Sequence, residues 1–292
     1  MIIVNLIGGL GNQMFQYAFC RALALELAEP TLLDISGFSS YTLHQGFELD
    51  RLFSCKIELA TELDFKSVLG WQSPSRIRNI LLHPYMSAFR KNNFVVEPYF
   101  QYWPEINSIP KKCYLSGYWQ SFQYFQKYTT EIRADFTYKI PLVNKNAEFA
   151  DQIKQVNAIS LHVRRGDYVS NPATLKNHGV CSLDYYDLAI QYIANHVLDP
   201  VFFIFSDDID WVKKNININY KTYYVDHNSG NDSFNDMRLM SLCKHHIIAN
   251  SSFSWWGAWL NSNPNKLVIA PQKWFANNND TKDLLPTDWI KL

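Results

Sequence analysis

Two adjacent arginines, Arg164 and Arg165, follow an apolar run and precede Gly166 and Asp167. The run at 158–163 contains β-branched residues, which predicts a buried strand that ends at the arginines. Open α/β sheets bind ligands just past the carboxyl ends of parallel strands, and a guanidinium offers a fork of donors that matches phosphate oxygens. We therefore predict that this strand end binds a diphosphate. The alternative is an ordinary surface ion pair with nearby carboxylates.

Polar clusters follow three more predicted strands, at 206–208, 226–228 and 250–254. The carboxyl ends of parallel strands share one edge of a sheet, so the four clusters are expected to converge on a nucleotide-type ligand. Where a strand feeds a helix, free backbone N–H groups and the helix dipole favour a phosphate. The candidate donor-binding residues are Arg164, Arg165, Ser206, Asp207, Asp208, Asp226, Asn250, Ser251, Ser252 and Phe253.

Asp208 and Asp210 form an Asp-x-Asp pair, which could hold a divalent cation beside a diphosphate. The two arginines and the helix start already supply positive potential at this edge, so no metal is expected. Asp207 and Asp208 would then accept hydrogen bonds from ribose hydroxyls or from a base edge.

A glycine-rich loop at 8–13 lies between a predicted strand and a helix predicted for 13–29. A dinucleotide-binding loop requires a third glycine, but Met14 holds that position; Asp34 would be the acidic residue of such a site. The loop could instead let a substrate approach the backbone, and a plain turn is the third interpretation. If a substrate binds here, the acceptor-side residues are Gly9, Gly11, Asn12 and Gln13.

An aromatic pair and two histidines are further candidates. Trp119 and Gln120 follow a strand predicted near 114, where the indole could stack on a sugar or simply pack in the core. His162 lies on the strand before the arginines, and His178 lies in a loop predicted for 166–180. We place Trp119 and His178 on the acceptor side, and each histidine could act in catalysis or in packing.

The 292-residue chain carries 27 basic and 27 acidic residues, a balance that argues against a nucleic-acid-binding protein. Its five cysteines form no Cys-x-x-Cys, which indicates a reducing cytoplasm and no zinc ribbon. No apolar run approaches the ~20 residues that span a bilayer, so we expect no integral membrane segment.

Strands and helices alternate regularly after a polar, proline-containing stretch at 140–146. This alternation predicts a doubly wound parallel sheet. We expect two α/β domains, 1–145 and 146–292. The strands of the second are predicted at 158–163, 201–205, 222–225, 246–250 and 266–270.

Four motifs occur in an order that resembles the bacterial α-1,2-fucosyltransferases of glycosyltransferase family 11. The resemblance runs from residue 2 nearly to the end, and it implies a GT-B fold with two Rossmann-like domains facing a cleft. It also implies inverting transfer of L-fucose from GDP-β-L-fucose, with no required metal or other cofactor. The motifs are GGLGNQMFQYA at 8–18, HVRRGDY at 162–168, FSDD at 205–208 and SSFSWWGAW at 251–259.

The same resemblance assigns the donor to the second domain and mainly the acceptor to the first. It implies that Arg164 contacts the diphosphate and that the loop at Asn12 faces the reaction centre. The expected acceptor is a galactose-terminated oligosaccharide or lipid-linked glycan, as in O-antigen synthesis. The expected location is the cytoplasm or the inner face of its membrane.

Departure of GDP would build negative charge on the diphosphate, which Arg164, Arg165 and the N–H groups near Ser251 would stabilise. Asp167 is the expected base for the acceptor hydroxyl, although it could instead orient Arg165. Asn12 and His162 are further catalytic candidates. Two rival functions remain open: a nicotinamide-dependent oxidoreductase that uses the glycine loop, and a glycan-binding protein without catalysis.

Overall fold

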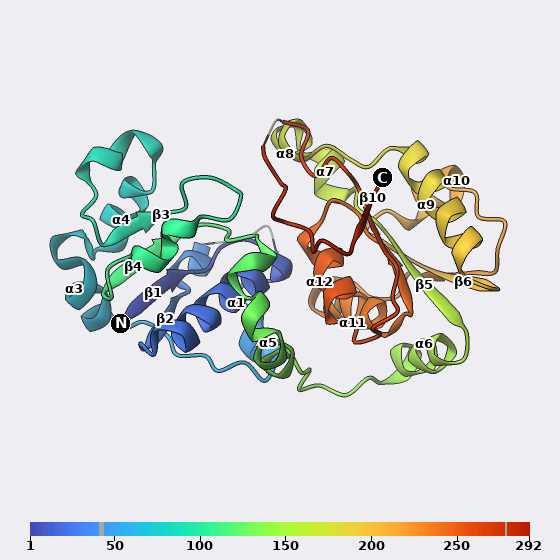
Figure 1. The fold of residues 1–292 in the computed structure, drawn as a ribbon, viewed down its shortest axis with the longest axis horizontal. Helices are drawn as coiled ribbons and strands as arrows, with labels where there is room; N and C mark the ends of the chain where they lie inside the picture. The colour runs from blue at the N-terminus through green and yellow to red at the C-terminus, as the bar shows by residue number, and fades with distance from the viewer. Residues whose placement is uncertain (41–43, 278) are drawn as a thin grey trace. The chain divides into compact units, whose positions relative to one another are not determined.

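The computed structural model describes residues 1–40, 44–277 and 279–292. The chain forms two compact units. The first contains Met1–Ile140 and Asp280–Leu285, and the second contains Pro141–Asn279 and Pro286–Leu292. Each unit is built on its own parallel β-sheet (Figure 1).

The sheet of the first unit has the strand order β2-β1-β4-β3, and all its strand pairs are parallel. Its strands are β1 (Ile2–Asn5), β2 (Thr31–Asp34), β3 (Phe94–Val96) and β4 (Cys113–Ser116). Its helices include α1 (Leu10–Leu27), α2 (Leu49–Leu52), α3 (Glu62–Leu69), α4 (Ser75–Leu81) and α5 (Thr129–Asp135), with the 3₁₀ turns η2 (Gly70–Gln72) and η3 (Pro84–Phe89).

Helix α1 begins at Leu10 rather than at the predicted residue 13, so Asn12 and Gln13 lie in its first turn. Gly9 caps the helix with extended backbone, and Gly8 has a φ of 81°, in the left-handed region that favours glycine. The sequence prediction started late because periodicity detects only the apolar part of a helix.

Strand β3 is absent from the sequence prediction. Its three residues lie in a segment interrupted by prolines and are too few to show a pattern. In the structure β3 pairs with β4, and Phe94 packs with Ile3, Phe65 and Tyr114 in one apolar cluster. Tertiary packing, rather than local sequence preference, stabilises this strand.

The sheet of the second unit has the order β10-β9-β8-β5-β6-β7, again with parallel pairs. β5 pairs with β6 along its whole length, which sets Val163 opposite Ser206. Its strands are β5 (Asn157–Val163), β6 (Pro200–Ser206), β7 (Thr222–Val225), β8 (His245–Ile247), β9 (Val268–Ala270) and β10 (Ile290–Lys291).

Helices cover both faces of this sheet (Figure 1). Ile159 and Leu161 of β5 pack toward α9 and α10, whereas Ala158 packs toward α6 and α11, because successive strand residues point to opposite faces. This arrangement confirms the predicted doubly wound parallel sheet. The helices are α6 (Asn144–Lys154), α7 (Gly166–Ser170), α8 (Pro172–His178), α9 (Leu183–His196), α10 (Ile209–Asn215), α11 (Phe234–Leu242) and α12 (Ser252–Leu260).

The predicted loop at 166–180 contains two short helices, α7 and α8, and the prediction is wrong there. The side chain of Asn171 accepts a hydrogen bond from the N–H of Thr174 at 3.2 Å, and Pro172 is the first helical residue of α8. Both are known helix-start signals, but the sequence interpretation weighed only apolar periodicity in this polar stretch.

Helix α12 carries three buried tryptophans, as expected for a helix packed into the domain. Trp255 and Trp256 meet edge to face with ring centroids 4.9 Å apart. A Cβ at Gly257 would lie 2.9 Å from the Cβ of Met240, so glycine allows α12 to approach α11 closely. Among the described residues, no helix is long and apolar enough to cross a membrane.

Candidate active site

Arg164 and Asp207 form an ion pair at the carboxyl edge of the second unit's sheet. Val163 and Ser206 are paired in register, so the next residues of β5 and β6 are neighbours. Arg164 Nη1 lies 2.9 Å from Asp207 Oδ2, and each side chain is 26% exposed. Asp207 Oδ1 also accepts the backbone N–H of Arg165 at 2.8 Å. The guanidinium is therefore held in place but remains partly open to solvent.

Gly166 makes this arrangement possible. A Cβ at this position would lie only 2.6 Å from Asp207 Oδ2. Any side chain here would displace the carboxylate that holds Arg164. The requirement for glycine therefore comes from close approach rather than from an unusual backbone angle.

Arg165 is less exposed than Arg164, with 17% of its side chain exposed. Its Nε donates to Asp208 Oδ2 at 3.2 Å, and its guanidinium carbon lies 3.7 Å from the centroid of the Trp211 ring. Asp208 also caps α10 by accepting the N–H of Trp211, and Ser206 Oγ accepts the N–H of Asp208. These contacts give Arg165, Asp208 and Ser206 a clear structural role at the start of α10.

His162 is buried on β5 beside the arginines. Burial lowers its pKa to about 4, so the ring is neutral at pH 7. Its centroid lies 6.0 Å from that of Phe253, and its Nδ1 has no hydrogen-bond partner among the described residues. The neutral imidazole therefore has a buried, unpaired ring nitrogen among the described residues and could not supply positive charge.

The serine-rich turn at the start of α12 splits into inner and outer residues. Asn250 is buried: its Nδ2 donates to the carbonyls of His178 and Trp274 at 2.9 and 3.1 Å, and its Oδ1 accepts from Cys181. Its side-chain amide is thus used within the protein. Ser251 is also buried and caps α12.

Ser252 and Phe253 occupy the first turn of α12 and are half-buried. They remain the outward part of this turn. His178 ends α8, and its ring stacks on Tyr168 with centroids 4.9 Å apart. His178 belongs to the second unit, together with the predicted donor-binding residues. The side chain of Asp167 lies outside the part of the chain that the structure describes.

A polar network beyond β7 was only partly foreseen. Asp226, the predicted residue, makes a 3.7 Å surface pair with Lys213. The neighbouring Asn228 donates to Asp236 Oδ1 at 2.7 Å, and burial raises the pKa of Asp236 to about 7. Sequence reasoning missed Asp236, because acidic residues are common in the first turn of a helix and therefore do not indicate a functional site. A carboxyl that titrates near neutrality is typical of functional sites.

In the first unit, Asn12 lies at the same kind of strand edge. Gln120 Nε2 donates to Asn12 Oδ1 at 2.7 Å, which fixes the orientation of the Asn12 amide. A Cβ at Gly8 would lie 2.5 Å from Asn12 Nδ2. Gly9 and Gly11 flank this site, at the cap and in the first turn of α1. The loop glycines thus allow Asn12 to lie close to the backbone.

Two predicted acceptor residues are instead structural. Gln13 is fully buried and bonds to Gly8, Gly46 and Glu48, so its amide cannot serve a substrate hydroxyl. Trp119 is also fully buried, with its ring stacked on Phe19 at 4.3 Å. The proposed stacking of Trp119 on a sugar is therefore corrected.

Glu97, after β3, was not predicted as a special residue. Its carboxylate accepts the backbone N–H groups of Tyr118 and Trp119 at 2.7 and 3.0 Å. Burial raises its pKa to about 7. Nothing in the sequence marked Glu97 as special, because β3 was not predicted and a glutamate in a loop has no diagnostic pattern.

The family-level comparison identifies the protein class. The sequence profile of glycosyltransferase family 11 matches residues 64–292. The chain belongs to glycosyltransferase family 11. It is 40% identical to an α-1,2-colitosyltransferase of Escherichia coli, over 100% of this chain and 99% of that protein. It is 38% identical to the O-antigen biosynthesis glycosyltransferase WbnK of Escherichia coli, over 98% of each.

Solved structures agree with this family 11 glycosyltransferase in fold. The fucosyltransferase NodZ, in a crystal soaked with GDP-fucose, superposes with a TM-score of 0.53. It is 14% identical, and the match covers 89% of this chain and 92% of NodZ. The α/β fold of the family 11 chain is therefore the GT-B type found in fucosyltransferases.

The family result removes the oxidoreductase alternative. The structure also shows where Asp34, the acidic residue expected of a dinucleotide site, makes its contacts. Asp34 accepts from Tyr114 at 2.8 Å and pairs with the buried Arg78 at 3.5 Å. Its carboxylate is thus buried inside the first unit of the glycosyltransferase rather than offered to a ribose. Met14, at the third glycine position, is also fully buried.

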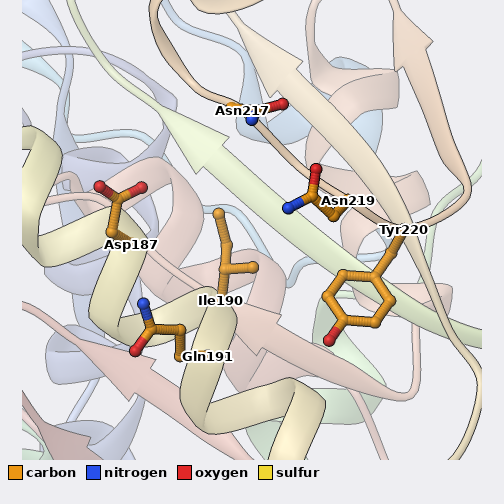
Figure 2. A pocket seen from close by; sticks show the side chains of 6 residues that line it. All are labelled: Asp187, Ile190, Gln191, Asn217, Asn219 and Tyr220. Atoms are coloured by element: carbon orange, nitrogen blue, oxygen red, sulfur yellow. The ribbon is translucent and has the colours of Figure 1, made fainter.

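A hollow of about 180 Å³ on the second unit lies apart from the candidate residues (Figure 2). Three of its lining residues come from α9 and three from the segment that enters β7. Because that segment precedes β7, the hollow is at the amino edge of the sheet, opposite the strand-end clusters. The lining residues are Asp187, Ile190, Gln191, Asn217, Asn219 and Tyr220.

Among the side chains that the structure describes, the Asp-x-Asp pair has no further metal ligands beside it. Within the described part of this glycosyltransferase, no three His, Cys, Asp or Glu side chains are placed to share a metal ion. Asp208 is held by Arg165 and by its own helix cap.

Proposed function

We propose that this family 11 glycosyltransferase is an inverting α-1,2-fucosyltransferase. It transfers L-fucose from GDP-β-L-fucose to the 2-hydroxyl of a galactose-terminated glycan, without a metal. More distant relatives support the linkage: the chain is 25% identical to the Bos taurus galactoside 2-alpha-L-fucosyltransferase SEC1, over 88% of this chain. The observation that carries the proposal is the partly exposed Arg164, fixed by Asp207 at the strand edge.

The proposed chemistry breaks the bond between L-fucose and the diphosphate of GDP. As the glycosidic bond breaks, negative charge grows on the diphosphate, and a preoriented guanidinium stabilises it without reorganising. The N–H groups of the first turn of α12 add positive potential on the same strand edge. Removing one hydrogen-bond donor to a developing negative charge costs about 10²–10³ in rate in well-studied sites.

The remaining roles are also proposals. Asp167 is proposed to accept the proton of the acceptor hydroxyl. Asn12, whose amide Gln120 orients, is proposed to bind the acceptor from the first unit. Ser252, Phe253 and the neutral His162 are proposed to contact the nucleotide from the second unit. The acceptor is proposed to be an oligosaccharide or a lipid-linked glycan of O-antigen type.

Colitosyl transfer is a second candidate, because a relative 40% identical over the whole chain carries that name. Colitose is L-fucose without its 3-hydroxyl, so the choice between donors depends on one hydroxyl. A site that hydrogen-bonds this hydroxyl rejects the analogue lacking it by about 10⁴-fold or more, whereas an apolar pocket rejects the added hydroxyl by only about 10².

The experiment compares GDP-fucose and GDP-colitose with the same galactose-terminated acceptors, in EDTA, followed by linkage analysis of the product. We expect an α-1,2-linked fucosyl product and a large preference for GDP-fucose. A preference for GDP-colitose would establish the second candidate. Activity that requires added Mn²⁺ would contradict the metal-independent mechanism.

A further inference from the structure

One segment of the first unit carries basic but no acidic residues. Residues 65–96 contain no aspartate or glutamate, although the whole chain has equal numbers of basic and acidic residues. A local excess of positive charge without acidic neighbours is typical of surfaces that bind anionic partners. The basic residues of this segment are Lys66, Arg76, Arg78, Arg90 and Lys91.

Four large apolar side chains project from the same segment into solvent. Tyr85 is 95% exposed, Phe89 63%, Trp71 58% and Ile80 53%. They come from η2, α4 and η3, which are consecutive in the chain. We refer to these four residues, with Arg76 and Lys91, as the α4–η3 patch.

Hydrogen bonds join the parts of the patch. The Nε2 of Gln72 donates to the carbonyl of Phe89 at 2.8 Å, and its Oε1 accepts the N–H of Lys91. These bonds join η2, the turn that contains Trp71, to the end of η3. Backbone bonds from His83 to Ile80 and from Met86 to His83 close the turn that carries Tyr85.

Other side chains of the segment pack against the core of the first unit, so the exposed side chains are not a sign of loose packing. Arg78 is buried, pairs with Asp34 at 3.5 Å, and lies 3.8 Å from the centroid of the Phe65 ring. On the same inner side, Ile77 and Met86 pack against the core. The inner face of this segment is thus fixed to the domain, while its outer face holds aromatic rings in solvent.

The cations of the patch are available to a partner. Arg76 and Lys91 are exposed, and neither has a carboxylate oxygen within 4.0 Å in the described parts of the chain. By contrast, Arg90 directs its guanidinium to the carbonyls of Leu81 and His83 at the end of α4. The patch therefore combines exposed aromatic rings with two basic groups that have no carboxylate partner among the described residues.

We propose that the α4–η3 patch binds the surface of a membrane that contains anionic lipids. Tryptophan and tyrosine favour the interface between headgroups and acyl chains, and exposed Arg and Lys attract lipid phosphates. A second copy of this chain is a poorer partner, because two such patches would bring like charges together. The proposal does not depend on which sugar the enzyme transfers.

The test is sedimentation of the full-length protein with vesicles made of equal parts phosphatidylglycerol and phosphatidylcholine, at low salt. We expect binding to these vesicles, and much weaker binding to phosphatidylcholine alone. Arg76→Gln with Lys91→Gln should lower the partition coefficient about 25-fold, at about fivefold for each charge. Tyr85→Ser with Phe89→Ser should lower it by at least about tenfold.

Matched controls remove similar groups from the second unit. Lys154→Gln with Lys214→Gln makes the same change in net charge, and Leu188→Ser with Leu198→Ser removes exposed apolar side chains. Both controls should bind vesicles like the wild type. The proposal is overturned if the wild type ignores anionic vesicles, if the patch variants bind normally, or if they instead convert a dimer to a monomer. Donor hydrolysis and transfer play no part in this readout.

Discussion

The chemistry proposed for this enzyme depends on how single side chains are held. Both arginines of the 162–168 motif contact aspartates, but only Arg164 keeps a quarter of its side chain exposed. Sequence reasoning found both arginines, because their position after a strand is visible in the pattern. The strand pattern alone could not rank them, because the contacts of Arg165 with Asp208 and Trp211 come from a different strand and helix; only the family resemblance singled out Arg164.

Asp167→Asn tests the proposed base. The substitution keeps size and hydrogen bonding but removes the ability to accept a proton. We expect turnover to fall about 10²–10⁴-fold while the dissociation constant for GDP stays unchanged. Steady-state kinetics and calorimetry with GDP measure the two effects. An equal loss of turnover and GDP affinity would assign Asp167 to donor binding.

Glu97 gives a pH-dependent prediction. Its pKa is about 7 in the folded enzyme against 4.5 in a model peptide, so the folded state holds the proton more tightly. Stability should therefore fall as the pH rises from about 4.5 to 7, by up to about 3 kcal/mol from this group. Glu97→Gln cannot titrate, so its free energy of unfolding should lack this component.

The measurement is urea unfolding of the wild type and Glu97→Gln across this pH range. The stability of the variant relative to the wild type should increase with pH. A constant difference between the two proteins would mean that the pKa of Glu97 is the same in the folded and unfolded states.

At the scale of elements, the sequence predicted the strands that alternate regularly with helices and missed several short elements. β7 was predicted with its observed bounds, because an apolar run is a local signal. α7, α8 and β3 were missed. Each is shorter than the window over which periodicity can be judged, and β3 is stabilised by packing from distant segments.

Gly166→Ala tests whether the β5–α7 junction positions Arg164. The new Cβ would lie 2.6 Å from Asp207 Oδ2, so the ion pair must shift. We expect turnover to fall about ten- to a hundredfold, because small displacements of a positioning group are costly. Gly37→Ala is the control, since its Cβ would meet no atom within 4 Å. Normal turnover in Gly166→Ala would mean that Asp207 does not position Arg164.

At the scale of the whole molecule, family membership and the GT-B fold are firm, whereas donor and acceptor are proposals. The sequence motifs indicated the family because they are long and occur in order. They did not show which polar side chains bond within the fold: the amides of Gln13, in the glycine-rich loop, and Asn250, in the cluster at 250–254, bond to protein groups. That distinction requires three-dimensional contacts.

The central claim is that Arg164 binds the diphosphate of a guanine nucleotide on the second unit. The most direct measurement is calorimetric titration of GDP into the wild type and Arg164→Ala, with Lys214→Ala as the control and thermal unfolding to verify the fold. A lost charged hydrogen bond is worth about 1.5–3 kcal/mol, so GDP should bind Arg164→Ala about 10- to 100-fold more weakly. Unchanged GDP affinity in a folded Arg164→Ala protein would contradict the account.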